Sequence, residues 1–236
     1  MRLDRLVADS GALTRSEARK QIKNGCVTVD GTVVRDISMH VDESCTLCIG
    51  GEEVHYSEFM YLMLNKPQGY VSATEDKKQK TVLDLLDPSF SRYNLFPVGR
   101  LDIDTVGFLL LTNDGALAHR LTAPSKDFGK TYFVRLEKNI SDNEISMLEE
   151  GVDIGGLITK PAKVIRQDEN EILLTITEGK FHQIKRMAKA VNNSVIYLKR
   201  LSYGELFLDE TLEEGNYRPL SRKELDLIYN VNKNSR

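Results

Sequence analysis

The spacing of apolar and polar positions predicts three short elements at the start of the chain. In LDRLVADSG, residues Leu3, Leu6 and Val7 are spaced for one face of a helix. The next segment, TRSEARKQIKNG, begins with the T-x-x-E pattern of a capping box and ends on a glycine, which predicts a second helix. In CVTVDGTVVRD, valines alternate around an Asp-Gly pair, which favours a β-hairpin with a type I′ turn. Residues 1 to about 40 are therefore expected to form a helix–helix–hairpin unit.

The rest of the chain mixes strand and helix patterns without the regular alternation of βαβ units. We assign strands to the apolar runs in FMYLMLNKPQGYV, GFLLL, KTYFVRL and AKVIRQDENEILLTI, and helices to SDNEISMLEEG, EGKFHQIKRMAKAV and SRKELDLIY. The expected fold is α+β, with a small N-terminal module followed by a larger domain on a mixed or antiparallel sheet. We expect the module with its linker at 1–58, the larger domain at 59–230 and a disordered tail at 231–236.

Composition narrows the class of protein. Apolar residues make up 41% of the chain and charged residues 28%, which is ordinary for a globular protein. The first residues lack an apolar secretory core, no run reaches membrane-spanning length, and three cysteines fit a reducing compartment, so we expect a cytoplasmic protein without a membrane partner. The formal net charge of −3 argues against uniform coating of nucleic acid but permits a local basic patch.

Two segments are locally basic. Residues 1–25 hold six Lys and Arg against three Asp and Glu, and Arg15, Arg19 and Lys23 fall in one row of the predicted helix. Residues 178–200 hold six Lys and Arg against one Glu, and Arg186 and Lys189 lie on the predicted helix there. Either row can be a plain solvated face, but single-faced spacing also suits contact with the phosphates of a nucleic acid.

A cysteine pair deserves separate consideration as a metal site. Cys45 and Cys48 form a C-x-x-C pattern, with His40 and His55 nearby. A structural zinc site usually needs a second such pair at defined spacing, and TLCIG reads as a short strand in which Cys48 is a small apolar residue. We expect no metal here.

The segment before the apolar run 108–111 is unusual, because it carries Arg100, Asp102 and Asp104. A carboxylate beside a buried strand costs several kcal/mol unless cations or hydrogen bonds compensate. One interpretation is structural, with Asp104 capping a turn and Asp102 pairing with Arg100. The other is catalytic: in extended chain the two carboxylates share a side, with α-carbons about 6.6 Å apart, as a glycosidase could use.

Two other residues have an ordinary and a functional interpretation. Tyr132 lies in the apolar segment KTYFVRL, where a tyrosine is usually core but can also be a platform for an unstacked base. His182 is a residue type often used in catalysis, but it stands at the expected start of a helix, where a polar contact is its more usual role. The residues alone leave both alternatives open.

The N-terminal segments RLDRLVADSG, TRSEARKQIKNGCVTVDG and VVRD resemble the small RNA-binding module shared by a small-subunit ribosomal protein, tyrosyl-tRNA synthetase and several RNA-modifying enzymes. The following motifs GRLDIDTVGFLLLTNDG, KTYFV and EGKFHQIKRM resemble the bacterial ribosomal RNA pseudouridine synthases. The branch that acts on small-subunit (16S) rRNA is the nearer match, strengthened by MYLMLNKPQGYVSATED, TKPA and GNYRPLS. The departures are Phe108, where a leucine is common, and an unmatched acidic loop around Cys45.

The resemblance implies a central cleft and a cofactor-free isomerisation of uridine to pseudouridine. It implies that Asp102 is the essential aspartate, acting as nucleophile or as base, Lys185 its basic partner and Tyr132 the residue that contacts the base. Arg100 is implied to bind substrate beside them. Arg15, Arg19, Lys23, Arg186 and Lys189 are the expected RNA contacts.

The implied partner is 16S rRNA, either free or in an assembling small subunit, and we expect a monomer. Two alternatives stay open: a synthase for a large-subunit (23S) site, because related enzymes share the motifs, and a non-catalytic ribosome-assembly protein that binds RNA. A glycoside hydrolase would instead release free uracil, and the chain has no Trp and no aromatic cluster around the two aspartates.

Overall fold

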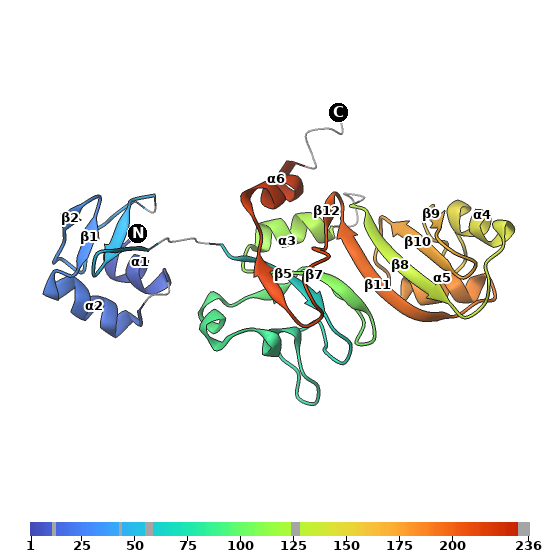
Figure 1. Ribbon diagram of the computed structural model, residues 1–236, viewed down its shortest axis with the longest axis horizontal. Helices are drawn as coiled ribbons and strands as arrows, with labels where there is room; N and C mark the ends of the chain where they lie inside the picture. Colours follow the sequence, from blue (N-terminus) through green and yellow to red (C-terminus); the bar gives the residue numbers. More distant parts are fainter. Residues whose placement is uncertain (11–12, 43, 55–58, 124–127, 231–236) are drawn as a thin grey trace. The chain divides into compact units, whose positions relative to one another are not determined.

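The computed structural model describes residues 1–10, 13–42, 44–54, 59–123 and 128–230. They form two compact units (Figure 1). Unit 1 comprises residues 1–60 and 88–94, and unit 2 comprises residues 61–87 and 95–236. The expected disordered tail lies outside the described residues.

Unit 1 consists of short helices and a small sheet. Along the chain it contains α1 (Leu3–Asp9), α2 (Arg15–Asn24), β1 (Val27–Val29), β2 (Thr32–Val33), β3 (Leu47–Ile49), β4 (Glu52–Val54) and the 3-10 helix η2 (Pro88–Tyr93). The strands pair antiparallel in the order β2-β1-β3-β4. The predicted residues Leu3, Leu6, Val7, Ala18 and Ile22 are all buried in one core. The expected helix–helix–hairpin unit is therefore confirmed.

Local sequence explains these elements. The Thr14 hydroxyl accepts a hydrogen bond from the Glu17 backbone N–H while the Glu17 carboxylate accepts one from the Thr14 N–H, which is the predicted capping box. Asp30 and Gly31 have φ of 50° and 78°, as a type I′ turn requires. The segment TLCIG, read as a short strand, contains β3, which is followed by β4, and Leu47 of β3 belongs to the core.

Unit 2 is built on a mixed sheet of nine strands within the described residues. Its strands are β5 (Tyr61–Lys66), β6 (Phe96–Pro97), β7 (Val106–Thr112), β8 (Lys130–Leu136), β9 (Lys163–Arg166), β10 (Glu171–Ile176), β11 (Val195–Tyr203), β12 (Leu206–Phe207) and β13 (Tyr217–Pro219). The order is β13-β5-β7-β11-β8-β10-β9, with β6 on β7 and β12 on β11. The described pairings are antiparallel except β7 with β11, so the α+β expectation is confirmed.

The helices cover two parts of this sheet (Figure 1). They are η1 (Val82–Leu85), α3 (Gly115–Thr122), α4 (Asp142–Glu150), α5 (Gln183–Ala190) and α6 (Arg222–Asn230). Side chains of α3 and α6, such as Leu121 and Ile228, share a core with Phe108 of β7. A separate apolar layer joins α4 and α5 to β8 and β10 through residues including Leu148 and Met187. No helix in the described ranges is long and apolar enough to cross a membrane.

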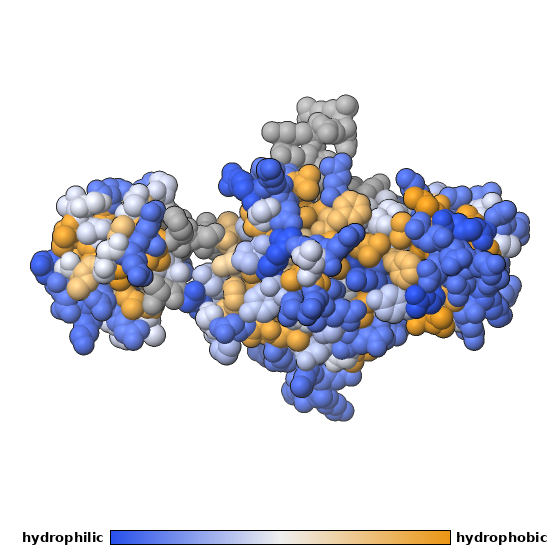
Figure 2. Space-filling view, in the orientation of Figure 1, coloured by the Kyte–Doolittle hydropathy of each residue, from blue (hydrophilic) through white to orange (hydrophobic). Residues whose placement is uncertain are grey.

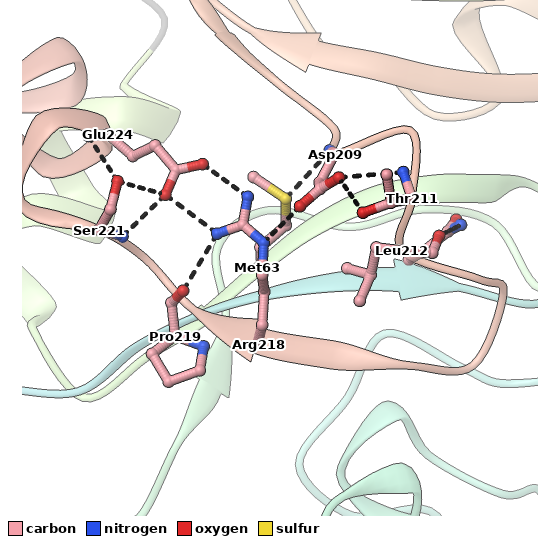
Figure 3. A network of polar contacts seen from close by, with 9 residues as sticks. Met63, Asp209, Thr211, Leu212, Arg218, Pro219, Ser221 and Glu224 are labelled. Carbon is pink, nitrogen blue, oxygen red and sulfur yellow. Dashed lines mark hydrogen bonds and ion pairs between the residues drawn. The ribbon is translucent and has the colours of Figure 1, made fainter.

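The C-terminal segment is tied down by an arginine of β13. Arg218 forms ion pairs with Asp209 and Glu224, each at 2.7 Å (Figure 3). Hydrogen bonds from Arg218 and Ser221 lower the pKa of Glu224 to about 2, against the effect of burial. Thr211 and Arg218 likewise lower the pKa of Asp209 to about 2.

Polar side chains cover most of the face of the chain in Figure 2, with apolar residues in scattered groups.

Candidate functional site

The site is built around the loop that enters β7. This loop is supported by Lys66, the last residue of β5, whose side chain is fully buried. The ammonium donates to the backbone carbonyls of Pro67 (3.1 Å), Asp102 (3.1 Å) and Thr105 (2.8 Å). Burial lowers the pKa of Lys66 to about 8 despite the carboxylates nearby. A buried cation therefore fixes the backbone from which Asp102 projects.

A serine and a glycine complete the support of this loop. The Ser72 hydroxyl donates to the Leu101 carbonyl and accepts from the Leu101 N–H, both at 3.0 Å. Gly107, at φ 98°, faces Arg200 across the parallel pairing of β7 and β11. A Cβ at this position would clash with the Arg200 backbone, so only glycine allows the two strands to approach here. Lys66 and Ser72 therefore fix the backbone of the loop, and the close approach at Gly107 fixes the strand that the loop enters.

Asp102 and Asp104 both face Lys185 of α5. The Lys185 ammonium lies 3.2 Å from Asp102 Oδ2 and 2.6 Å from Asp104 Oδ1. Burial raises the pKa of Asp104, but the hydrogen bond and charge of Lys185 outweigh it and hold that pKa below its usual value. Burial would lower the pKa of Lys185, but the hydrogen bonds and charges of Asp104 and Asp102 outweigh burial and raise that pKa above its usual value. The cation at this site therefore stays charged at neutral pH, as a partner that favours an ionised carboxylate.

His182 approaches Asp102 from the start of α5. It has φ 49°, a left-handed conformation, and its Nε2 lies 3.6 Å from Asp102 Oδ1. Its ring stacks on Phe181 with centroids 3.8 Å apart and the planes inclined by 20°. His182 is thus part of the charged cluster, a contact that its position in the sequence did not reveal.

A cavity of about 420 Å³ opens beside this cluster. Asp102, Arg100, Tyr132 and His182 all line it. Tyr132 lies mid-strand in β8, paired with Leu174 of β10, and is mostly buried with one part at the cavity wall. The volume falls in the range of small-ligand sites. A single extruded nucleotide is a ligand of suitable size.

The four predicted site residues meet in one place. Arg100, Asp102, Tyr132 and Lys185 together line a smaller hollow of about 80 Å³ that adjoins the cluster. Within the described residues no ion pair joins Arg100 to Asp102, because Asp102 is held by Lys185 instead. Asp102 therefore does not pair with Arg100, and both carboxylates face Lys185 instead.

The predicted RNA contacts have different environments. Arg15, Lys23 and Lys189 are exposed. Arg19 donates to the fully buried Asp4 carboxylate at 2.9 Å, together with Arg2.

Arg186 donates to the backbone carbonyls of Ile154 and Phe181. Arg19 and Arg186 therefore hold the fold as well as offering charge. Among the described residues no group of three metal-ligating side chains is found, and His55 lies outside them.

Lys66 went unrecognised in the sequence, and His182 was expected only as a polar contact at the start of a helix. Lys66 could have been noticed, because a lysine ending the apolar run YLMLNK needs backbone or carboxylate partners if buried. His182 gave no distinguishing signal, since its approach to Asp102 depends on how α5 packs against the loop of β7.

Two family models match the chain. The model of the RNA pseudouridylate synthase family matches residues 60–190, and the S4 domain model matches residues 1–44. A crystal structure titled pseudouridylate synthase superposes with a TM-score of 0.68 and is 38% identical, covering 97% of this chain and 99% of that one.

Similarity to curated proteins extends over nearly the whole chain. An uncharacterized RNA pseudouridine synthase of Bacillus subtilis, YtzG, is 54% identical over 234 residues, covering 97% of this chain and 98% of that protein. The ribosomal small subunit pseudouridine synthase A of Haemophilus influenzae is 39% identical over 231 residues, covering 97% and 99%. That of Vibrio vulnificus is 41% identical over 233 residues, covering 97% and 100%.

Proposed function

The chain belongs to the RNA pseudouridylate synthase family, and we propose that it isomerises one uridine of small-subunit (16S) ribosomal RNA to pseudouridine, with Asp102 as the essential carboxylate. The substrate is supported by relatives named ribosomal small subunit pseudouridine synthase A, which are 39–41% identical along nearly their full length. The protein acts in the cytoplasm as a monomer under this proposal, on free 16S rRNA or on an assembling particle.

The observation that carries the proposal is the Asp102–Lys185 pair, whose aspartate lines the 420 Å³ cavity. The reaction breaks the bond between uracil N1 and ribose C1′ and forms one between C5 and C1′; the proton leaves C5 and N1 gains one. Asp102 would act at the ribose, either attacking C1′ or removing a ribose proton. In both cases it acts as a carboxylate, and the Lys185 ammonium lies 3.2 Å from it as the opposite charge.

Tyr132 and Arg100 would position the uridine. A base inside folded RNA must be extruded before it can react, at a few kcal/mol. Contact with the ring of Tyr132 can return about 1–3 kcal/mol if the base stacks there. Arg100 is exposed at the rim of the same cavity, where a guanidinium can meet the RNA backbone. These roles require no cofactor.

The S4 domain would supply affinity for the RNA. Arg15 and Lys23 project from α2 without a carboxylate partner among the described residues, whereas Arg19 serves Asp4. Lys189 would extend the basic surface on unit 2, and Arg186 would contribute its charge beside it. In this proposal residues 1–58 bind RNA and residues 59–230 carry the reaction.

The test is to map pseudouridine in RNA treated with the purified chain. Unmodified 16S rRNA, 23S rRNA and partly assembled small subunits would be incubated separately and read at nucleotide resolution. We expect one converted uridine in 16S rRNA or its particle and none in 23S rRNA. Conversion confined to 23S rRNA would establish the large-subunit alternative, and binding without conversion would establish a non-catalytic RNA binder.

A further inference from the structure

The 420 Å³ cavity is lined by two cations, Lys130 and Arg200, that have neither a role in the proposed reaction nor a carboxylate partner among the described residues. Arg200 of β11 is only 1% exposed, and its Nε donates to the Phe108 carbonyl at 2.7 Å. Lys130, the first residue of β8, is half-buried, and its ammonium donates to the Phe128 carbonyl at 3.1 Å. Both cations lie over the ring of Tyr203, at 4.6 Å and 5.6 Å from its centroid, and all three line the cavity.

Neither cation has a carboxylate partner among the described residues. Nη2 of Arg200 is buried there without any hydrogen-bond partner. Glu178 also lines the cavity, but its oxygens are engaged by Lys180 at 2.9 Å, by Gln183 at 2.8 Å and by a backbone N–H. Asp102 is occupied by Lys185. Buried donors without acceptors are rare in folded proteins, so Nη2 of Arg200 requires a partner that the described residues do not supply.

The electrostatics of the pair also favour an anion. Burial, and then the charge of Arg200, lower the pKa of Lys130 to about 8. Two like charges brought together in a partly desolvated cavity repel each other, so the arrangement is stabilised when a negative group enters between them. A guanidinium beside an ammonium is also a common donor set for phosphate oxygens.

We propose that Lys130 and Arg200 form a subsite for a phosphate group that flanks the target uridine. This inference rests on the proposed function, because it takes the occupant of the cavity to be a ribonucleotide of the substrate. Within a nucleotide, phosphate is the one anionic group, and it lies within a few bonds of the ribose on which Asp102 would act. The subsite would therefore help to fix the sugar relative to Asp102, which lines the same cavity.

Ligand binding by the full chain tests the subsite without requiring turnover. Dissociation constants would be measured for uridine, uridine 3′-phosphate, uridine 5′-phosphate and inorganic phosphate alone. We expect one of the two monophosphates to bind at least about tenfold more tightly than uridine, the size of a charge-assisted hydrogen bond. Inorganic phosphate, which lacks the base contacts, should bind more weakly than that monophosphate.

Substitutions of Lys130 and Arg200 test whether these two residues cause the preference for the monophosphate. Lys130→Met should remove most of the advantage of the monophosphate while leaving the affinity for uridine within about twofold. Arg200→Lys, which keeps the charge but loses the forked donor, should remove part of it. The matched control is Lys180→Met, which removes a cation of the same cavity that already has a carboxylate partner and should leave the advantage intact.

Equal binding of uridine and both monophosphates would overturn the subsite, as would an advantage that survives Lys130→Met. Either result would mean that the two cations meet water or a uracil oxygen instead. Conversion of uridine in rRNA, measured on the same preparations, reports separately on the proposed function. A preference for the monophosphate without conversion of uridine would support the subsite and contradict the proposed function. Conversion without that preference would support the proposed function and contradict the subsite.

Discussion

Replacing Lys66 by methionine separates positioning of the site from stability of the fold. The buried ammonium holds the backbone carbonyls of Asp102 and Thr105 in the loop that carries Asp102, and also the carbonyl of Pro67. Methionine fills a similar volume without donors, so the loop loses this support. Displacement of a reacting group by about 1 Å can cost about a hundredfold in rate. We expect turnover by Lys66→Met to fall by about that factor or more.

Stability should change much less, because two effects oppose each other. Losing the donors leaves the buried Thr105 carbonyl without a partner, at about 1–3 kcal/mol, whereas the Pro67 and Asp102 carbonyls are only part-buried and cost less because water can reach them. Removing the ammonium relieves a burial cost: lowering its pKa from 10.5 to about 8 corresponds to about 3 kcal/mol at 1.36 kcal/mol per pH unit. The free energy of unfolding at pH 7 is therefore expected to stay within about 2 kcal/mol of wild type.

The assay pairs denaturant unfolding with single-turnover conversion of uridine in rRNA. The control is Lys80→Met, the same substitution at an exposed lysine of unit 2, which should change neither quantity. Wild-type turnover in folded Lys66→Met would refute the reasoning, because the loop would then not depend on the lysine. A loss of stability well above 4 kcal/mol would also refute it, since the burial cost would not be offsetting the lost bonds.

The pH dependence of stability gives an independent check on Lys66. Its pKa is lower in the folded chain, so between pH 8 and 10.5 the unfolded state binds more protons than the folded state. Stability attributable to this group therefore rises with pH across that window, by up to about 3 kcal/mol. The wild-type curve should rise relative to that of Lys66→Met, and parallel curves would contradict the assignment.

Three further predictions concern other parts of the chain. Glu224 has its pKa lowered to about 2, so the stability that it adds is complete above pH 4.5 and is lost as the pH falls toward 2. Acid unfolding of Glu224→Gln should lack this pH dependence, and acid unfolding curves identical to those of wild type would contradict the prediction. Arg19→Gln should destabilise unit 1 by about 1–3 kcal/mol, because it weakens the support of the buried Asp4 carboxylate. Arg15→Gln should leave stability unchanged and reduce the slope of log K for RNA binding against log salt concentration by about 1. A loss of stability in Arg15→Gln but not in Arg19→Gln would contradict the assignment. Lys185→Met should abolish conversion with little loss of RNA affinity, and normal conversion with weak binding would exclude its role at Asp102.

The elements that depend on neighbouring residues could be predicted from the sequence. The box at Thr14 and Glu17, the Asp-Gly turn at residues 30–31 and the box at Ser141 each involve groups within three positions of one another, and all three are present in the structure. The buried strand expected at 108–111 is the middle of β7, in which every residue is buried.

Features that depend on distant pairing could not be predicted in this way. The parallel contact of β7 with β11 joins residues about 93 positions apart, and it brings Arg200 to the cavity wall. Lys66 and His182 acquire their roles only when β5, β7 and α5 are packed together. The predicted quartet of site residues was reached through the resemblance of motifs, because nothing in their local spacing places Tyr132 or Lys185 beside Asp102.

The most direct measurement of the central claim compares two carboxylates two residues apart. Asp102 and Asp104 both pair with Lys185, but only Asp102 lines the two cavities at the site. Conversion of uridine in 16S rRNA would be measured for wild type, Asp102→Asn and Asp104→Asn under single-turnover conditions, with RNA affinity measured alongside. We predict no detectable conversion by Asp102→Asn with RNA affinity retained, and measurable conversion by Asp104→Asn. Conversion by Asp102→Asn at the wild-type rate would contradict the account.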